Sequence, residues 1–216
     1  SIVADDNDEE FPLPMFIAMD PPKHDHQRKE VSGAVSPSNL AKMEDLIRGR
    51  VRAILDSLPF REEFNWVDLV SIELTTQMLA TLFDFPFEDR RKLTRWSDVA
   101  TAGPDSGIVE SEEQRREELI ECLEYFTVLW NDRVNEEPRH DLVSMLAHGK
   151  STRNMDPVEY LGNLILLIVG GNDTTRNSIS GGVRFLNENP VEYQKLRQNP
   201  GLIRNMVAEI IRFQTP

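Results

Sequence analysis

The sequence predicts a mainly α-helical protein, and three observations support this fold class. Apolar residues recur every three or four positions over most of the 216-residue chain, which is the period of an amphipathic helix. Ser or Asp residues stand where these periodic segments begin, as is typical of helix N-termini. A run from Leu161 to Val169 is almost entirely apolar, and at this length it indicates a buried central helix rather than a membrane span.

The individual elements follow from turn residues and apolar spacing. The first residues are acidic and lead into a proline-broken run ending at Phe16, which predicts a loop. Helices are predicted over about 23–32, 36–58, 68–84, 88–100, 111–137 and 141–147, then from 157 onward, between Pro190 and Pro200, and over 202–213. A short extended piece is expected near 64–66, and the loop at 103–107 is where a lid would move.

Composition limits the function classes. The formal net charge of −13 argues against a nucleic-acid binder, which normally carries a basic surface. The single cysteine, Cys122, cannot form an internal disulfide, and no signal peptide opens the chain, so a cytoplasmic protein is the simplest expectation. The abrupt first and last residues suggest a piece of a longer protein.

The central helix carries an unusual polar cluster. Helical geometry puts six residues on one stripe: Leu166, Val169, Gly170, Asp173, Thr174 and Asn177. Gly170 and Gly171 each cost about 1 kcal/mol in a helix unless the space is used. These residues alone leave three interpretations open: a functional site, a turn with Asn172 or Asp173 capping a second helix, or a glycine pair that only lets two helices pack closely.

Three other features have simple structural explanations. His24 and Arg28 are spaced to grip one anionic group, but a solvated basic helix has the same pattern. Glu209 and Arg212 can pair on a helix surface for only tenths of a kcal/mol. Cys122 has no histidine or second cysteine beside it, so a core or surface thiol is expected rather than a reactive or metal-binding one.

Taken together, three segments resemble landmarks of the cytochrome P450 family of heme-thiolate monooxygenases. They are Asp20–His24 with Arg28, Gly170–Thr175, and Glu209–Arg212. Two runs, Phe16–His24 and Ile72–Pro86, resemble bacterial alkane and fatty-acid terminal (omega) hydroxylases in particular. The resemblance implies that residues 1–216 form one partial P450 domain, roughly helices C to K around the central helix with minimal β structure.

The resemblance also implies roles for site residues. His24 and Arg28 would bind the heme propionates, and Gly170 and Gly171 would leave room for dioxygen above the porphyrin. Asp173 and Thr174 would be the acid and the alcohol that deliver protons during oxygen activation. Leu166 and Val169 would line an apolar substrate pocket. Glu209 and Arg212 would form a buried structural ion pair, whose disruption would cost several kcal/mol.

Two parts of the family pattern are expected to be missing. The axial cysteine near the family's C-terminus does not occur in this sequence, and Cys122 is in the wrong context, so no metal ligand is assigned. The N-terminal part of the family's fold is also expected to be absent, and this chain alone is expected to be inactive.

The function that the resemblance implies belongs to the longer protein. That enzyme would hold heme b (iron protoporphyrin IX), take electrons from NAD(P)H through ferredoxin and ferredoxin reductase, and use O2. It would hydroxylate a small apolar substrate, at the terminal carbon of an n-alkane or fatty acid, with no nucleic-acid partner and no membrane span. The alternative is a helical binding or scaffold protein without catalysis.

Overall fold

The structure, a computed structural model, describes residues 13–103 and 105–215. All the regular structure in these two ranges is helical, so the predicted mainly α fold is confirmed, and residues 64 and 65 form no strand. The acidic opening segment with Phe11 and Pro12, and Pro104 in the expected lid loop, lie outside the described residues.

The N-terminal helices begin close to where the sequence places them. A 3₁₀ turn, η1 (Phe16–Ala18), precedes α1 (Lys23–Ser32) and α2 (Pro37–Asp56). Ser36 caps α2 by accepting a hydrogen bond from the Asn39 backbone N–H, and Pro37 occupies the first turn, where its missing N–H does no harm. The Asp20 side chain does not cap α1; only its backbone carbonyl accepts a bond, from His24 N–H at 3.2 Å.

The next segment starts with an unexpected π-helical turn. The turn η2 (Val67–Ile72) runs directly into α3 (Glu73–Phe83), and the Asn65 side chain caps it by accepting from the Val67 N–H at 3.0 Å. Asp84 ends α3 in the left-handed conformation, at φ 49°. After Pro86 come η3 (Phe87–Asp89) and α4 (Arg91–Thr101), so the predicted interruption between the helices over 68–84 and 88–100 is confirmed.

Two helices follow the loop around residue 104. Ser111 caps α5 (Glu112–Val134), and Asp141 caps α6 (Leu142–His148). Aromatic side chains from α3, α4 and α5 form the centre of the core: Phe83, Phe126 and Trp96 are at most 1% exposed, and Phe85 stacks on Tyr125 with ring centroids 4.7 Å apart. This aromatic core fixes α3, α4 and α5 relative to one another.

The central helix, α7, is continuous from Pro157 to Glu188. The interpretation of Gly170–Asp173 as a turn is therefore wrong, and the cap of this helix is Asp156, which accepts from the Val158 and Glu159 N–H groups. Three short elements follow: α8 (Pro190–Gln198), η4 (Pro200–Leu202) and α9 (Ile203–Gln214).

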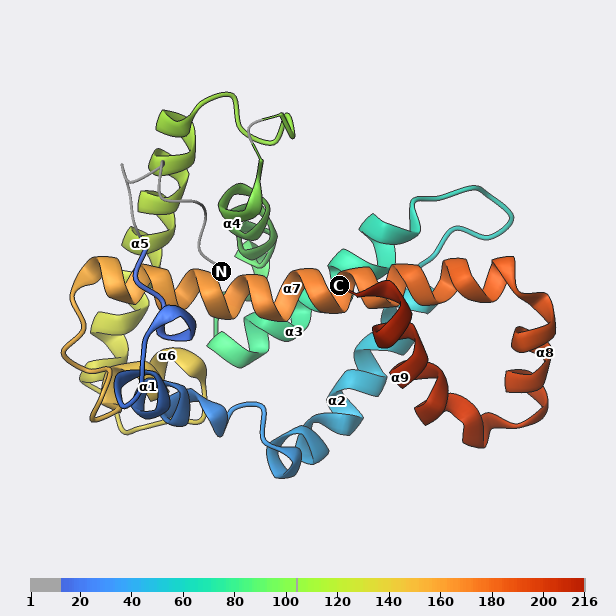
Figure 1. Cartoon of the computed structure of the whole chain (residues 1–216), viewed down its shortest axis with the longest axis horizontal. Helices are drawn as coiled ribbons and strands as arrows, with labels where there is room; N and C mark the ends of the chain where they lie inside the picture. The colour runs from blue at the N-terminus through green and yellow to red at the C-terminus, as the bar shows by residue number, and fades with distance from the viewer. Residues whose placement is uncertain (1–12, 104, 216) are drawn as a thin grey trace.

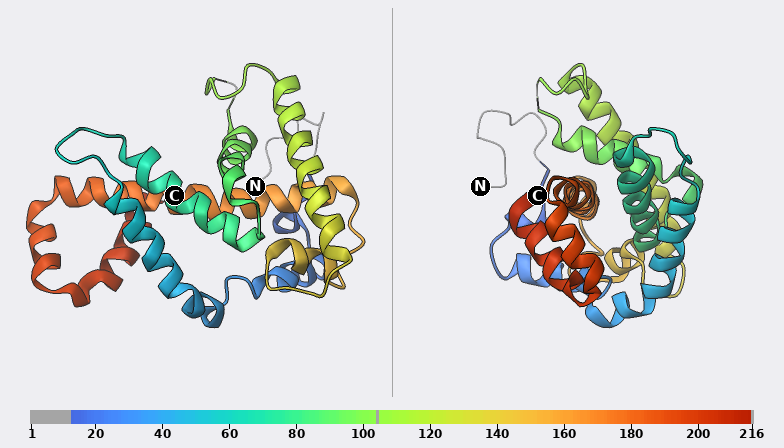
Figure 2. Two further views of the ribbon diagram at one scale, coloured as in Figure 1. Left: turned by 180° about the vertical axis from the view of Figure 1, so that it is seen from behind. Right: turned by 90° about the vertical axis from the view of Figure 1, so that its right-hand side faces the viewer.

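The other elements pack around α7 (Figure 1). It spans the long dimension of the molecule and contacts α3, α4, α5, α8, α9 and the π-helical turn. Seen nearly end-on in Figure 2 (right), α7 has α3 to its right, while α1 and α9 both lie below it. The first half of α7 is mostly buried, whereas most residues of its second half are partly buried or exposed, so an accessible site on the helix lies near or beyond this transition.

A buried polar network attaches the N-terminal segment to α7. Gln27, 1% exposed, donates to Glu159 Oε1 at 2.5 Å and accepts from Asn163 Nδ2 at 3.1 Å. Asn163 in turn accepts from the Phe16 N–H at 2.8 Å. Because each buried polar group is satisfied by another, this network fixes the position of α1, which carries His24 and Arg28.

Candidate functional site

The two glycines of α7 face different surroundings. A methyl group added to Gly170 would meet no atom within 4 Å, whereas one added to Gly171 would lie 2.7 Å from Leu79 Cδ2 on α3. Gly170 is exposed and leaves the helix surface open at this point, and its role beside a cofactor stays a prediction. Gly171 instead permits close packing of α3 on α7, as in the interpretation that a glycine here only lets two helices pack closely. The assignment of Gly171 beside dioxygen stays a prediction.

Thr174 lies on the same exposed strip as Gly170. Its Oγ1 donates to the Gly170 carbonyl at 3.0 Å, one turn earlier in the helix. Its side chain also lines one end of an open groove of about 540 Å³ between α7 and α9, whose other lining residues are mainly apolar, among them Ile179, Val183, Met206 and Ile210. The hydroxyl is therefore accessible and sits at the border of an apolar surface.

Asp173 turns away from this strip toward α4. Its Oδ1 accepts from Arg176 Nη2 at 2.8 Å, from Ser97 Oγ at 3.3 Å and from the Asn172 amide at 3.3 Å. Asp173 and Thr174 therefore do not point in the same direction, although the sequence predicts one stripe for both. The carboxyl of Asp173 faces α4, whereas the hydroxyl of Thr174 faces the side of α9. In this arrangement a proton would have to cross the helix surface to pass between them.

The surroundings of Asp173 make protonation easier than for an ordinary aspartate. Burial raises the pKa of this carboxyl above its usual value, the positive charge of Arg176 opposes that effect, and the nearby Asp98 carboxylate adds to it. Only 20% of the side-chain surface is exposed. A carboxyl with raised pKa that still reaches solvent is suited to taking up and releasing protons.

His24 and Arg28 lie one turn apart on α1. His24 Nδ1 is 2.8 Å from the Phe16 carbonyl, which requires Nδ1 to carry a proton and leaves Nε2 to donate to an anion in the imidazolium form. Arg28 is exposed and makes no hydrogen bond or ion pair with the residues that the structure describes. The pair therefore has donors available, which an anionic group could use.

Two places in the structure each offer something that a heme with two carboxylate groups would need. Its anionic edge would find donors on His24 and Arg28, which can bind carboxylates with charge-assisted hydrogen bonds. Its flat face would need a helix surface without side chains, and the position of Gly170 offers one. In residues 13–103 and 105–215, no cluster of three or more His, Cys, Asp or Glu side chains could hold a metal ion directly.

Leu166 and Val169 lie between the core and the exposed strip. Both are partly buried and pack against the hydrophobic core, and neither belongs to the groove beside α9. Their assignment to a substrate pocket stays a prediction.

Glu209 and Arg212 form an ion pair, but the expectation that it is buried is wrong in this structure. Arg212 Nη2 lies 2.6 Å from Glu209 Oε1, with side chains 68% and 61% exposed, respectively. Both residues lie on α9, a helix without a buried residue. The pair is therefore a solvated one within a single helix, and the large cost expected for breaking a buried pair does not apply.

The sequence interpretation missed three residues beside Asp173: Ser97, Asp98 and Arg176. Ser97 and Asp98 come from α4, far away in the sequence, and no local pattern marks them. Arg176 follows Asp173 by three positions, a spacing at which side chains on a helix meet, so this partner was detectable.

Cys122 is a core residue, which is one of the two positions, core or surface, that were predicted for it. It is fully buried in α5, and burial raises the pKa of its thiol well above the usual value. A thiol in this environment is a poor nucleophile and a poor metal ligand. Among the described residues, no helix is long and apolar enough to cross a membrane.

Comparisons with known proteins agree with one another. A solved cytochrome P450-153 from Novosphingobium aromaticivorans is 46% identical, with a TM-score of 0.85 over 98% of this chain and 51% of that one. The structure of CYP153D17 from Sphingomonas sp. PAMC 26605 is 50% identical, with a TM-score of 0.84 over 97% of this chain and 52% of its own. Linalool 8-monooxygenase from Pseudomonas putida is 34% identical over 93% of this chain and 50% of its own length.

These matches cover nearly all of this chain but only about half of the proteins it matches. The chain spans about half the length of the curated relatives it matches, and no family model matches it. The similarity covers nearly all of the chain, in sequence and in fold alike, including the helix with Gly170, Asp173 and Thr174. The chain therefore belongs to the cytochrome P450 family.

Proposed function

We propose that this chain carries the oxygen-activating helix of a heme b monooxygenase. The observation that carries the proposal is the middle of α7, where Gly170 faces open space and the accessible Thr174 hydroxyl lies one turn away. Asp173, the neighbouring carboxyl, has its pKa raised by burial, and Arg176 opposes that shift. An open surface, an alcohol and an acid are the groups that protein-assisted proton delivery to oxygen needs.

The chain's residues would have separate tasks. Thr174 would hold a proton at Oγ1 beside the open face, and Asp173 would resupply it from the α4 side. His24 and Arg28 would bind the two carboxylates of the cofactor. Heme, when bound, supplies the iron that activates O2. Because Thr174 Oγ1 donates a hydrogen bond to the Gly170 carbonyl, this hydrogen bond must break before the hydroxyl can donate to another acceptor.

For the substrate we propose the terminal carbon of an n-alkane or a fatty acid. The support is the resemblance of Phe16–His24 and Ile72–Pro86 to bacterial terminal hydroxylases, together with the apolar side chains of Leu166 and Val169 beside Gly170. The similarity to a linalool 8-monooxygenase also favours an apolar substrate. An apolar wall with few polar groups binds a hydrocarbon chain without specifying its length.

Electron supply and location complete the proposal. Reducing equivalents would come from NAD(P)H through a ferredoxin and its reductase, and the enzyme would work in the bacterial cytoplasm. Two electrons and two protons per O2 reduce one oxygen atom to water while the other enters the substrate. The proton route through Asp173 and Thr174 would carry these protons.

The test uses the heme-loaded protein that contains this chain. With carbon monoxide and a reductant, we expect the Soret band of a thiolate-ligated heme, and with ferredoxin, its reductase and medium-chain alkanes or fatty acids we expect terminal alcohols. Subterminal alcohols alone would contradict the regiochemistry. Absence of both the Soret band and any substrate-induced spectral change would contradict the monooxygenase and favour a helical scaffold.

A further inference from the structure

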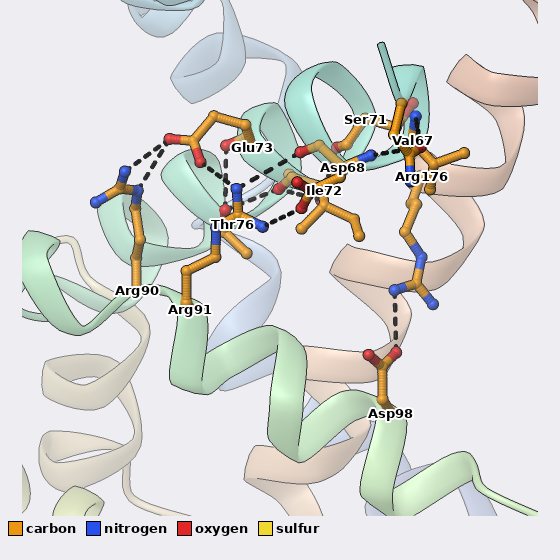
Figure 3. Close-up of polar contacts among 12 residues, drawn as sticks. Val67, Asp68, Ser71, Ile72, Glu73, Thr76, Arg90, Arg91, Asp98 and Arg176 are labelled. Atoms are coloured by element: carbon orange, nitrogen blue, oxygen red, sulfur yellow. Dashed lines mark hydrogen bonds and ion pairs between the residues drawn. The ribbon is translucent and has the colours of Figure 1, made fainter. Parts of the chain in front are cut away.

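A single guanidinium joins two carboxylates on two helices. Arg176 Nη2 on α7 lies 2.8 Å from Asp173 Oδ1, and its Nη1 lies 3.0 Å from Asp98 Oδ1 on α4. Figure 3 shows the link from Arg176 to Asp98 between the two helices. The side chains of Arg176, Asp173 and Asp98 are 17%, 20% and 31% exposed. Their charges are therefore only partly screened by water.

The remaining groups that face Asp173 are neutral. Ser97 on α4 and Asn172 on α7 each donate to Oδ1, and Thr75 on α3 donates to the Asn172 amide oxygen at 3.0 Å. In the described part of the chain, the charged groups that act on Asp173 are Arg176 and Asp98. Arg176 thus serves two carboxylates, which compete for its guanidinium. Asp98 also interacts with the positive charge of Arg95 on α4.

We propose that Arg176 and Asp98 are positioning residues that together set how readily Asp173 takes up a proton. Arg176 stabilises the Asp173 carboxylate and holds it toward α4. Asp98 has the opposite effect, because it shares the guanidinium and adds a second negative charge nearby. The inference rests on the proposed function only for the use that Asp173 makes of its proton.

Two substitutions should move the proton affinity of Asp173 in opposite directions. In Arg176→Gln the positive charge is lost, so the carboxyl should titrate at higher pH than in the parent protein. In Asp98→Asn the competing negative charge is lost and Arg176 is left to Asp173 alone, so the carboxyl should titrate at lower pH. Arg176→Lys keeps the charge and should stay closer to the parent than Arg176→Gln.

The measurement is a carboxyl titration in the heme-loaded protein that contains this chain. Aspartate labelled with ¹³C at the side-chain carboxyl is followed by NMR or difference infrared spectroscopy, and the Asp173→Asn variant identifies the signal. Arg184→Gln is the matched control, because Arg184 also lies on α7 but is 74% exposed and pairs with Glu188. It should leave the Asp173 midpoint unchanged.

Opposite shifts of the midpoint would support the proposal. Shifts in the same direction, or unchanged midpoints with lower thermal stability, would overturn it and leave Arg176 and Asp98 as a simple link between two helices. The pH dependence of product formed per NAD(P)H is the second readout. If it stays fixed while the midpoints move apart, the positioning role stands and the assignment of Asp173 as proton source fails.

Discussion

Two glycines of α7, Gly162 and Gly170, differ in what a methyl group added at each position would contact. Gly162 is covered by the N-terminal segment, and a methyl group added there would lie 2.1 Å from the Pro14 carbonyl oxygen. Gly170, eight residues later on the same helix, faces open space. The sequence marked Gly170 through its polar neighbours, but it did not mark Gly162, because Pro14 is distant along the chain and its approach depends on the tertiary fold.

The contrast between Gly162 and Gly170 leads to two opposite predictions for the stability of the fold. Gly162→Ala should destabilise the protein by about 1–3 kcal/mol, since backbone must move to admit the methyl group. Gly170→Ala should stabilise the fold by up to about 1 kcal/mol through helix propensity. Urea denaturation of both variants checks this, and equal effects from the two substitutions would contradict the different surroundings of the two glycines.

At the scale of elements, ion pairs determine how α3 meets α4. Glu73 at the start of α3 accepts from Arg90 on Oε1 at 2.8 Å and from Arg91 on Oε2 at 2.8 Å (Figure 3). Burial tends to raise the pKa of Glu73, but hydrogen bonds from Gln77 and Arg90 and the two positive charges outweigh it, so the net pKa is lowered. The Glu73 carboxylate is therefore favoured in the folded state.

This lowered pKa predicts an acid-dependent contribution to stability. A carboxyl whose folded pKa is depressed contributes above its unfolded value, here about 4.5, and loses that contribution as pH falls through the folded pKa. Glu73→Gln should cost on the order of 1 kcal/mol at pH 7. Denaturation of both proteins from pH 7 to pH 3 should show this difference shrink, and a difference independent of pH would contradict the role of the charge.

Helix boundaries were predictable because their causes are local. Ser36 and Asp156 cap their helices with their own side chains, and proline follows each of them. The π-helical turn at Val67–Ile72 was not predictable, since apolar spacing does not distinguish it from the first turn of an α-helix. The ion pair between Arg176 and Asp98 was also not predictable from the sequence, because it joins α7 to α4 and so depends on the tertiary fold.

At the scale of the whole molecule, burial is unevenly distributed. Large apolar side chains are fully buried in α4, α5 and the first half of α7, whereas α8 and α9 contain no buried residue. Three residues spaced four apart on α9, Ile203, Val207 and Ile211, are 46–51% exposed. The expected burial of Glu209 and Arg212 fails for the same reason, since α9 contacts only α7 and its neighbouring turn closely.

Uneven burial predicts uneven protection from hydrogen exchange. Amides of α9 should exchange much faster than those of α4, because local opening of α9 exposes little additional apolar surface. Mass spectrometry after exchange in D2O can compare the two helices in this chain. Equal protection of α9 and α4 would contradict this expectation, and would mean that another protein segment covers α9.

The central claim is that the middle of α7 delivers protons to oxygen, and Thr174 tests it most directly. The measurement is product formed per NAD(P)H consumed in the heme-loaded protein, for Thr174→Val and Thr174→Ser. Valine keeps the shape without the hydroxyl, so it should leave substrate binding intact but divert reducing equivalents to peroxide, while serine should restore much of the coupling. Full coupling in Thr174→Val would contradict the claim.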